Sequence, residues 1–93
     1  MVTVLCMCQV ADFDRWRPGY VRDVGAESAL LSFQVWRGQD DPNLVTIVET
    51  YDSREAAEAV LSSADVFEAM QRDGVDLSSL HVYFLDEVAS GGR

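Results

Sequence analysis

The stretch FQVWRGQDDPNLVTIVETYDSREAA, residues 33–57, decides the fold. Its segments 33–37 and 45–51 are rich in β-branched and aromatic residues, which is typical of strands. The polar residues 40–43 between them include a proline and an asparagine, and they predict a turn. Ser53 is then suited to be the N-cap of a helix. The centre of the chain is therefore predicted to be a hairpin that leads into a helix.

The flanking segments carry hydrophobic patterns that extend this arrangement in both directions. Asp12 and Asp14 are both possible N-caps of a first helix, and Pro18 is tolerated in its first turn if Asp14 is the cap. The expected elements are a strand buried on both faces over 2–10, a helix with Phe13, Trp16, Tyr20 and Val24 on one face that ends near Gly25, strands over 30–37 and 45–51, a helix over 54–61, a short helix through Val66, Phe67 and Met70 that stops at Gly74, and a strand over 80–88.

This element order, βαββαβ, predicts an α+β fold of the ferredoxin-like type. Two right-handed crossovers give a four-stranded antiparallel sheet with strand order 4-1-3-2 and the helices on one face. Residues 1–88 are expected to form this single domain, and residues 89–93 a flexible C-terminal tail. The strands carry apolar side chains on both faces, so the open face of the sheet is expected to pair with a second copy in a homodimer.

Charge and composition exclude several classes of function. The chain of 93 residues has a formal net charge of -9, and its cations are seven arginines with no lysine. Phosphates would be repelled, so neither nucleic acid nor an anionic membrane is an expected partner. The absence of lysine rules out a Schiff-base mechanism. Because no apolar run approaches the roughly 20 residues needed to cross a bilayer, we expect a cytoplasmic protein.

The sequence also lacks the usual signatures of cofactor and metal binding. Cys6 and Cys8 lie two residues apart in a strand and point the same way, which does not suit a disulfide. They are expected to be small core residues, and without clustered histidines they do not make a metal site. There is no glycine-rich phosphate loop, serine elbow or Cys–His dyad. Any catalysis is therefore expected to need no cofactor.

Several short segments resemble a known group of proteins. They are DFDRW at 12–16, DPN at 41–43, ETYDS at 49–53, Ala69-Met70 and Gly74-Val75. On these segments the chain resembles the dimeric α+β barrel superfamily, close to the antibiotic-biosynthesis-monooxygenase-like proteins, over about residues 2–88. That resemblance implies a hydrophobic small-molecule ligand bound between the sheet and the helices. It leaves the reaction open among cofactor-free oxygenation, polyketide cyclisation, lactone isomerisation and haem degradation.

Three polar side chains are candidates for proton transfer. Glu49 is the one acidic residue inside an apolar strand, and burial in a closed pocket would suit it to acid–base work; near the strand end it could instead meet water or an arginine. His81 is the only imidazole in the chain, and Tyr83 shares its face by strand alternation. They could act as base and hydrogen-bond donor, or His81 could lie exposed at the rim of the sheet.

Aromatic residues and methionines at strand and helix spacing are candidates for a ligand pocket. The predicted pocket residues are Trp16, Tyr20, Trp36, Tyr51, Phe67 and Met70. Such a stripe is more often core than binding site, yet this much aromatic bulk could also enclose an aromatic ligand by stacking. Trp36 and Arg37 point to opposite faces, so at most one of them reaches the pocket.

Two functions follow from these observations. The first is a small cofactor-independent enzyme that acts on a hydrophobic aromatic or polyketide-like substrate, by cyclase- or isomerase-type proton chemistry or by monooxygenation. The second is a non-catalytic dimer that binds a ligand or supports another enzyme. A cavity shared by Glu49, His81 and Tyr83 would favour the first.

Overall fold

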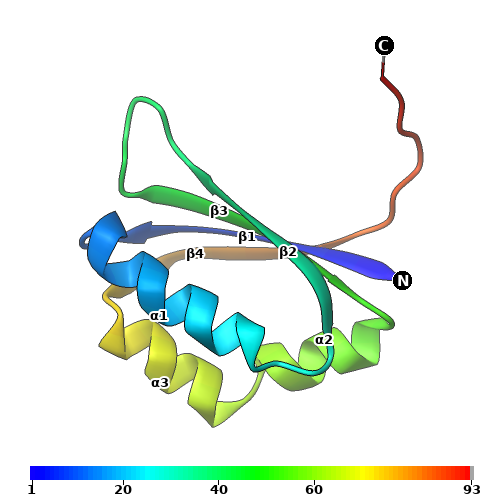
Figure 1. The fold of residues 1–93 in the computed structure, drawn as a ribbon, viewed down its shortest axis with the longest axis horizontal. Helices are drawn as coiled ribbons and strands as arrows, with labels where there is room; N and C mark the ends of the chain where they lie inside the picture. The colour runs from blue at the N-terminus through cyan, green and yellow to red at the C-terminus, as the bar shows by residue number, and fades with distance from the viewer. Residues whose placement is uncertain (93) are drawn as a thin grey trace.

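The structure, a computed structural model, describes residues 1–92 and has the predicted βαββαβ order with the second helical segment split in two (Figure 1). The elements are β1 (Val2–Val10), α1 (Phe13–Gly25), β2 (Leu30–Arg37), β3 (Leu44–Tyr51), α2 (Arg54–Leu61), α3 (Ala64–Arg72) and β4 (Val75–Leu85).

The four strands form one antiparallel sheet in the order β2-β3-β1-β4. This is the predicted order 4-1-3-2 seen from the other edge. All three helices cover the same face of the sheet, and the other face is left open (Figure 1). The ferredoxin-like α+β fold is therefore confirmed. Within residues 1–92, no helix is long and apolar enough to cross a membrane.

The last strand differs from the prediction at both ends. β4 begins at Val75 and ends at Leu85, whereas a strand over 80–88 was expected. Its first half was missed because its polar residues belong to an irregularity in the ladder, where the pairing with β1 shifts. There the Ser79 hydroxyl accepts a hydrogen bond from the Gln9 N–H at 2.8 Å and donates one to the Asp76 carbonyl at 2.6 Å. Side chains that usually mark a loop thus satisfy backbone groups inside a strand.

The N-terminus of α1 uses the first of the two possible N-caps. Asp12 is the N-cap, and its carboxylate accepts a hydrogen bond from the Asp14 N–H at 3.0 Å. The side-chain oxygen of Asn43, from the β2–β3 turn, accepts a second from the Phe13 N–H at 3.1 Å. Pro18 therefore lies in the second turn, where it removes one helical hydrogen bond on the exposed side of the helix.

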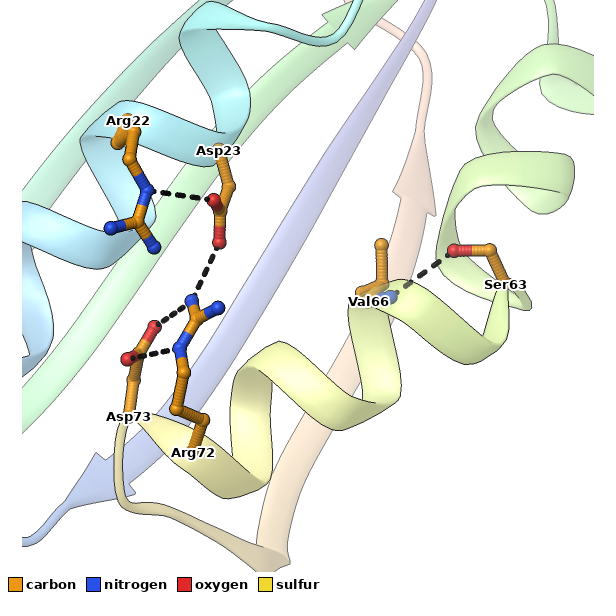
Figure 2. Close-up of polar contacts among 6 residues, drawn as sticks. All are labelled: Arg22, Asp23, Ser63, Val66, Arg72 and Asp73. Carbon is orange, nitrogen blue, oxygen red and sulfur yellow. Dashed lines mark hydrogen bonds and ion pairs between the residues drawn. The ribbon is translucent and has the colours of Figure 1, made fainter.

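Ser53 and Gly74 lie at helix ends as predicted, and Ser63 is a further cap that was not predicted. The hydroxyl of Ser53 caps α2, and that of Ser63 caps α3 by accepting from the Val66 N–H at 3.2 Å (Figure 2). Gly74 follows α3 with φ of 83°, a conformation that favours glycine. It directs the chain into β4. Beyond Leu85, residues 86–92 have no regular secondary structure, and Arg93 of the predicted tail lies outside the described residues.

The core lies between the sheet and the helices. Alternate residues of β1 and β3 face the helices and are buried, and the most enclosed of them are Val4, Val45 and Tyr51. The same alternation determines which side chains of β1 and β3 a ligand between the sheet and the helices would contact. Glu49 is the one buried charged residue in that set.

Candidate functional site

A cavity of about 130 Å³ lies on the helix-covered face of the sheet. Its walls are almost entirely apolar, as is usual for small-molecule sites. The sheet supplies Cys6, Ile47, Glu49 and Tyr51, while Trp16 and Tyr20 come from α1 and Val66 and Met70 from α3.

Glu49 is the polar centre of this cavity. Its side chain is only 6 % exposed, and both carboxylate oxygens accept a hydrogen bond. The Tyr20 hydroxyl donates to Oε2 at 2.6 Å, and the Tyr51 hydroxyl donates to Oε1 at 2.8 Å. Hydrogen bonds to a carboxylate are the short, strong kind and offset the cost of burying its charge. The phenol of Tyr20 on α1 and the phenol of Tyr51 on β3 therefore hold the Glu49 carboxylate in a fixed orientation.

Burial keeps the neighbouring groups in their neutral forms. Desolvation raises the pKa of the Tyr20 and Tyr51 hydroxyls, and the adjacent Glu49 raises both pKa values further. The pKa of the Cys6 thiol is raised to about 12, first by burial and then by Glu49. Near neutral pH both phenols therefore remain hydrogen-bond donors, and the thiol is not a nucleophile.

The aromatic wall is built by stacking. The rings of Trp16 and Tyr20 lie 4.9 Å apart between centroids and are nearly parallel, and the rings of Tyr20 and Phe33 pack edge to face with centroids 5.9 Å apart. This packing orients the Tyr20 hydroxyl toward Glu49. A flat apolar ligand would meet ring faces and edges along this wall.

The outer part of the cavity is acidic. Asp23 and Glu27 at the end of α1 and Asp73 at the end of α3 contribute to the lining. Arg72 bridges the two helices: its guanidinium is 2.9 Å from Asp23 and 2.9 Å from Asp73 (Figure 2). Hydrogen bonding to Arg72 lowers the pKa of the Asp73 carboxyl. These contacts join the C-terminal ends of α1 and α3 beside the cavity.

The structure separates two of the three candidate catalytic residues from the third. In the β1–β4 ladder, His81 pairs with Met7 and Tyr83 with Leu5, which places both on the open face of the sheet. Both side chains are exposed, whereas Glu49 faces the helices. Within one chain the three therefore share no cavity, because strand alternation sends them to opposite faces.

The predicted pocket residues divide in the same way. Trp16, Tyr20, Tyr51 and Met70 line the cavity. Trp36 does not, because it pairs with Thr46 on the open face and is 59 % exposed. Arg37 points to the helix side, as expected from alternation, but stacks over the Phe13 ring at 4.8 Å instead of lining the cavity.

Phe67 is the other predicted pocket residue that lies elsewhere. Its side chain is exposed on α3, outside the cavity lining. Conversely, Asp23, Glu27 and Asp73 were not predicted. The first two continue the helical spacing of Trp16 and Tyr20, so that spacing could have identified them.

The described residues hold no group of three or more His, Cys, Asp or Glu side chains arranged to bind a metal ion. The polar groups that the cavity offers a ligand are the Glu49 carboxylate, the two phenols bound to it and the acidic side chains at its outer part.

Comparisons with known proteins agree with this architecture. No curated protein matches the chain. A solved putative antibiotic biosynthesis monooxygenase from Chloroflexus aurantiacus J-10-fl is similar with a TM-score of 0.73 and 22% identity, over 98% of this chain and 96% of that one. One from Deinococcus radiodurans has a TM-score of 0.74 and 17% identity, over 100% and 98% of the two chains.

A third similar structure is SnoaB, a cofactor-independent oxygenase from Streptomyces nogalater. Its TM-score is 0.77 with 10% identity, over 96% of this chain and 94% of that one. At these identities the structural likeness establishes the shared fold. The sequence model of the family described as antibiotic biosynthesis monooxygenase matches residues 10–72. The chain belongs to this antibiotic biosynthesis monooxygenase family.

Proposed function

We propose that this protein is a small cofactor-independent enzyme that removes a proton from a hydrophobic aromatic or polyketide-like molecule bound in the cavity. One observation carries the proposal: the Glu49 carboxylate is buried at the cavity wall and held by the Tyr20 and Tyr51 hydroxyls. A base of this kind beside two neutral donors is suited to generate and stabilise an enolate.

The proposed step transfers one proton and one electron pair. Glu49 takes the proton from an acidic C–H group of the ligand, and the electron pair of that bond moves onto the neighbouring carbonyl oxygen to form an enolate. The negative charge thereby moves from the carboxylate to the ligand. Because the raised pKa values of Tyr20 and Tyr51 keep both phenols protonated, either phenol can donate its hydrogen bond to the new oxyanion.

Three outcomes can follow from the enolate. Return of the proton to another carbon gives isomerisation, and attack of the enolate carbon on an electrophilic carbon of the same molecule gives cyclisation. In air, the carbanion can instead transfer electrons to O₂ and take back the proton from Glu49, which gives a hydroperoxide. If the oxygenated carbon still carries a hydrogen, loss of water then leaves a new carbonyl group. The oxygenation route has support from the similarity to a cofactor-independent oxygenase.

We also propose that two copies of the chain pair through the open face of the sheet. That face exposes the large apolar side chains of Met7, Trp36, Tyr83 and Leu85, a group that single soluble domains seldom leave in water. In such a dimer His81 and Tyr83 lie at the interface and not in the cavity. Light scattering at micromolar concentration should give twice the chain mass, and a monomeric mass would refute the pairing.

A second function is favoured by the same hydrogen bonds. Both Glu49 oxygens already have a phenol partner, which is the arrangement expected of a structural buried carboxylate. The alternative is a non-catalytic dimer that binds a hydrophobic ligand or supports another enzyme.

Product analysis separates the two functions. The purified protein is mixed with anthrone-like and poly-β-keto aromatic compounds, in air and without oxygen. The masses of the products are then measured by mass spectrometry. Conversion that is lost in Glu49→Gln and retained in Glu55→Gln, which changes an exposed carboxylate on α2, supports the enzyme. Equal conversion by both variants removes Glu49 from the reaction, and binding without conversion favours the accessory role.

A further inference from the structure

We propose that the cavity selects neutral or positively charged aromatic ligands and rejects carboxylates and other anions. This inference rests on the proposed function only in placing the ligand in the cavity between the sheet and the helices. It limits the class of possible substrates by their charge and by the size of the part that fits inside the cavity.

The ionisable side chains of the lining are the first argument. Apart from its cysteines and tyrosines, the cavity has four ionisable lining residues, Asp23, Glu27, Glu49 and Asp73, and every one is a carboxylic acid. No arginine or histidine of the described residues contributes to the lining. A ligand carboxylate would therefore find no charged partner on the wall.

The arginine that contacts two of these acids is already engaged. The Arg72 guanidinium contacts both Asp23 and Asp73, with a third hydrogen bond from its Nε to Asp73 Oδ1 at 3.0 Å (Figure 2). Arg22 also pairs with Asp23 at 3.3 Å. An anionic ligand would have to break these ion pairs to gain a partner.

Acidic side chains lie at both the inner and the outer part of the cavity. A ligand carboxylate therefore meets at least one of them in either orientation. Glu49 is buried, whereas the Asp23 side chain is 41% exposed at the outer part. A carboxylate directed inward meets Glu49, which has no cationic partner among the described residues. One directed outward meets Glu27 together with Asp23 and Asp73, whose charges their arginine partners offset in part. At about 6 Å and an effective dielectric constant of about 20, repulsion by the Glu49 charge weakens binding on the order of 100-fold, and the screened outer acids repel less strongly.

A cation benefits from the same surroundings. The carboxylates attract it, and the aromatic rings of Trp16, Tyr20 and Tyr51 in the lining offer electron-rich faces. The hydroxyl of an alcohol can donate to a phenol oxygen or to the Glu49 carboxylate without charge repulsion. The expected order of affinity is therefore amine, then alcohol, then carboxylate.

Cavity volume sets the size of the enclosed part. About 130 Å³ is close to the volume of an apolar cavity of roughly 150 Å³ that holds one benzene ring. One ring is therefore enclosed, and a second or third ring projects from the opening. Two-ring compounds are the smallest probes that fill the cavity and carry a substituent.

The test uses three naphthalenes that differ in one group: 2-naphthylmethylamine, 2-naphthylmethanol and 2-naphthoate. Calorimetry at pH 7 should show that the amine and the alcohol bind and that the carboxylate binds more weakly than the alcohol, by up to about 100-fold if its carboxylate faces Glu49. In Glu49→Gln the difference between alcohol and carboxylate should shrink.

A pair of matched variants ties binding to the cavity. Ala69→Phe places a ring in the lining and should abolish binding of the amine and the alcohol, whereas Ala59→Phe, on an exposed position of α2, should leave it unchanged.

Each remaining outcome overturns a distinct statement. If the carboxylate binds as tightly as the alcohol and Ala69→Phe prevents both, the cavity is a ligand site without the proposed charge selection. If none of the three compounds binds, or if Ala69→Phe leaves binding intact, the ligand does not lie in the cavity, and both the charge selection and the proposed function fail.

Discussion

The loss of stability on removing one hydroxyl that donates to Glu49 follows most directly from the structure. Tyr51 is 1 % exposed, and its hydroxyl donates to Glu49 Oε1 at 2.8 Å. Tyr51→Phe keeps the ring and its packing but leaves one oxygen of a buried carboxylate without a donor. Hydrogen bonds to charged groups contribute about 1.5–3 kcal/mol, so the free energy of unfolding should fall by about that amount.

The assay is equilibrium unfolding in urea, followed by circular dichroism. With a urea m-value between about 1 and 3 kcal/mol/M, a loss of about 2 kcal/mol lowers the midpoint by roughly 1 M. In a domain of this size it also lowers the melting temperature by roughly 8–16 °C. Ser28→Ala, which removes an exposed hydroxyl in the turn before β2, is the control and should change stability by less than about 0.5 kcal/mol.

A double variant separates the hydrogen bond from other effects of the hydroxyl. In a Glu49→Gln background the carboxylate charge is gone, so Tyr51→Phe should cost clearly less than it does in the unaltered protein. If Tyr51→Phe unfolds at the same urea concentration as the unaltered protein, Glu49 does not depend on this donor, and the account of the buried carboxylate is refuted.

Three further perturbations test the packing and charges around the cavity. A Cβ at Gly19 would lie 2.5 Å from Asp73 Oδ2, whereas one at Gly25 meets nothing within 4 Å. Gly19→Ala must therefore displace the Asp73 carboxylate from Arg72, and in urea unfolding it should be less stable than Gly25→Ala by about 1 kcal/mol. Because Arg72 lowers the pKa of Asp73 below its ordinary value of 3.8, this carboxylate stabilises the fold above that value and loses the effect as the pH falls through its depressed pKa. Asp73→Asn should flatten the acid limb of stability measured between pH 2 and 6, and an unchanged limb would contradict the ion pair. The pKa of Cys6 is raised to about 12 by burial, so iodoacetamide at pH 8 should modify this thiol only in urea, as measured by mass; rapid modification of the folded protein would contradict its burial.

The fold could be predicted because local patterns agree with one another along most of the chain. The same arrangement is required by the apolar run over 2–10, the β-branched and aromatic segments at 33–37 and 45–51, the polar turn at 40–43 and the serine cap at Ser53. The bounds of β4 were predicted wrongly. Its residues 76–79 resemble a loop in the sequence, because the hydrogen bonds that hold them in the strand come from β1, far away in the sequence.

The candidate site could be predicted only in part. Glu49 stands out as an acid in an apolar strand, and Tyr51 follows two residues later on the same face. The contact with Tyr20 joins residues 29 apart in the sequence, and no local pattern indicates it. The face occupied by His81 and Tyr83 depends on the irregular register between β1 and β4, so alternation within one strand could not relate them to Glu49.

The central claim is that Glu49 takes a proton from a ligand in the cavity, and hydrogen–deuterium exchange of the ligand tests it most directly. An anthrone-type compound is incubated with the protein in D₂O without oxygen, and loss of its acidic C–H signal is followed by NMR. We expect the unaltered protein and Glu55→Gln to accelerate exchange and Glu49→Gln not to do so. Equal acceleration by Glu49→Gln, or none by the unaltered protein while the compound is bound, would contradict the claim.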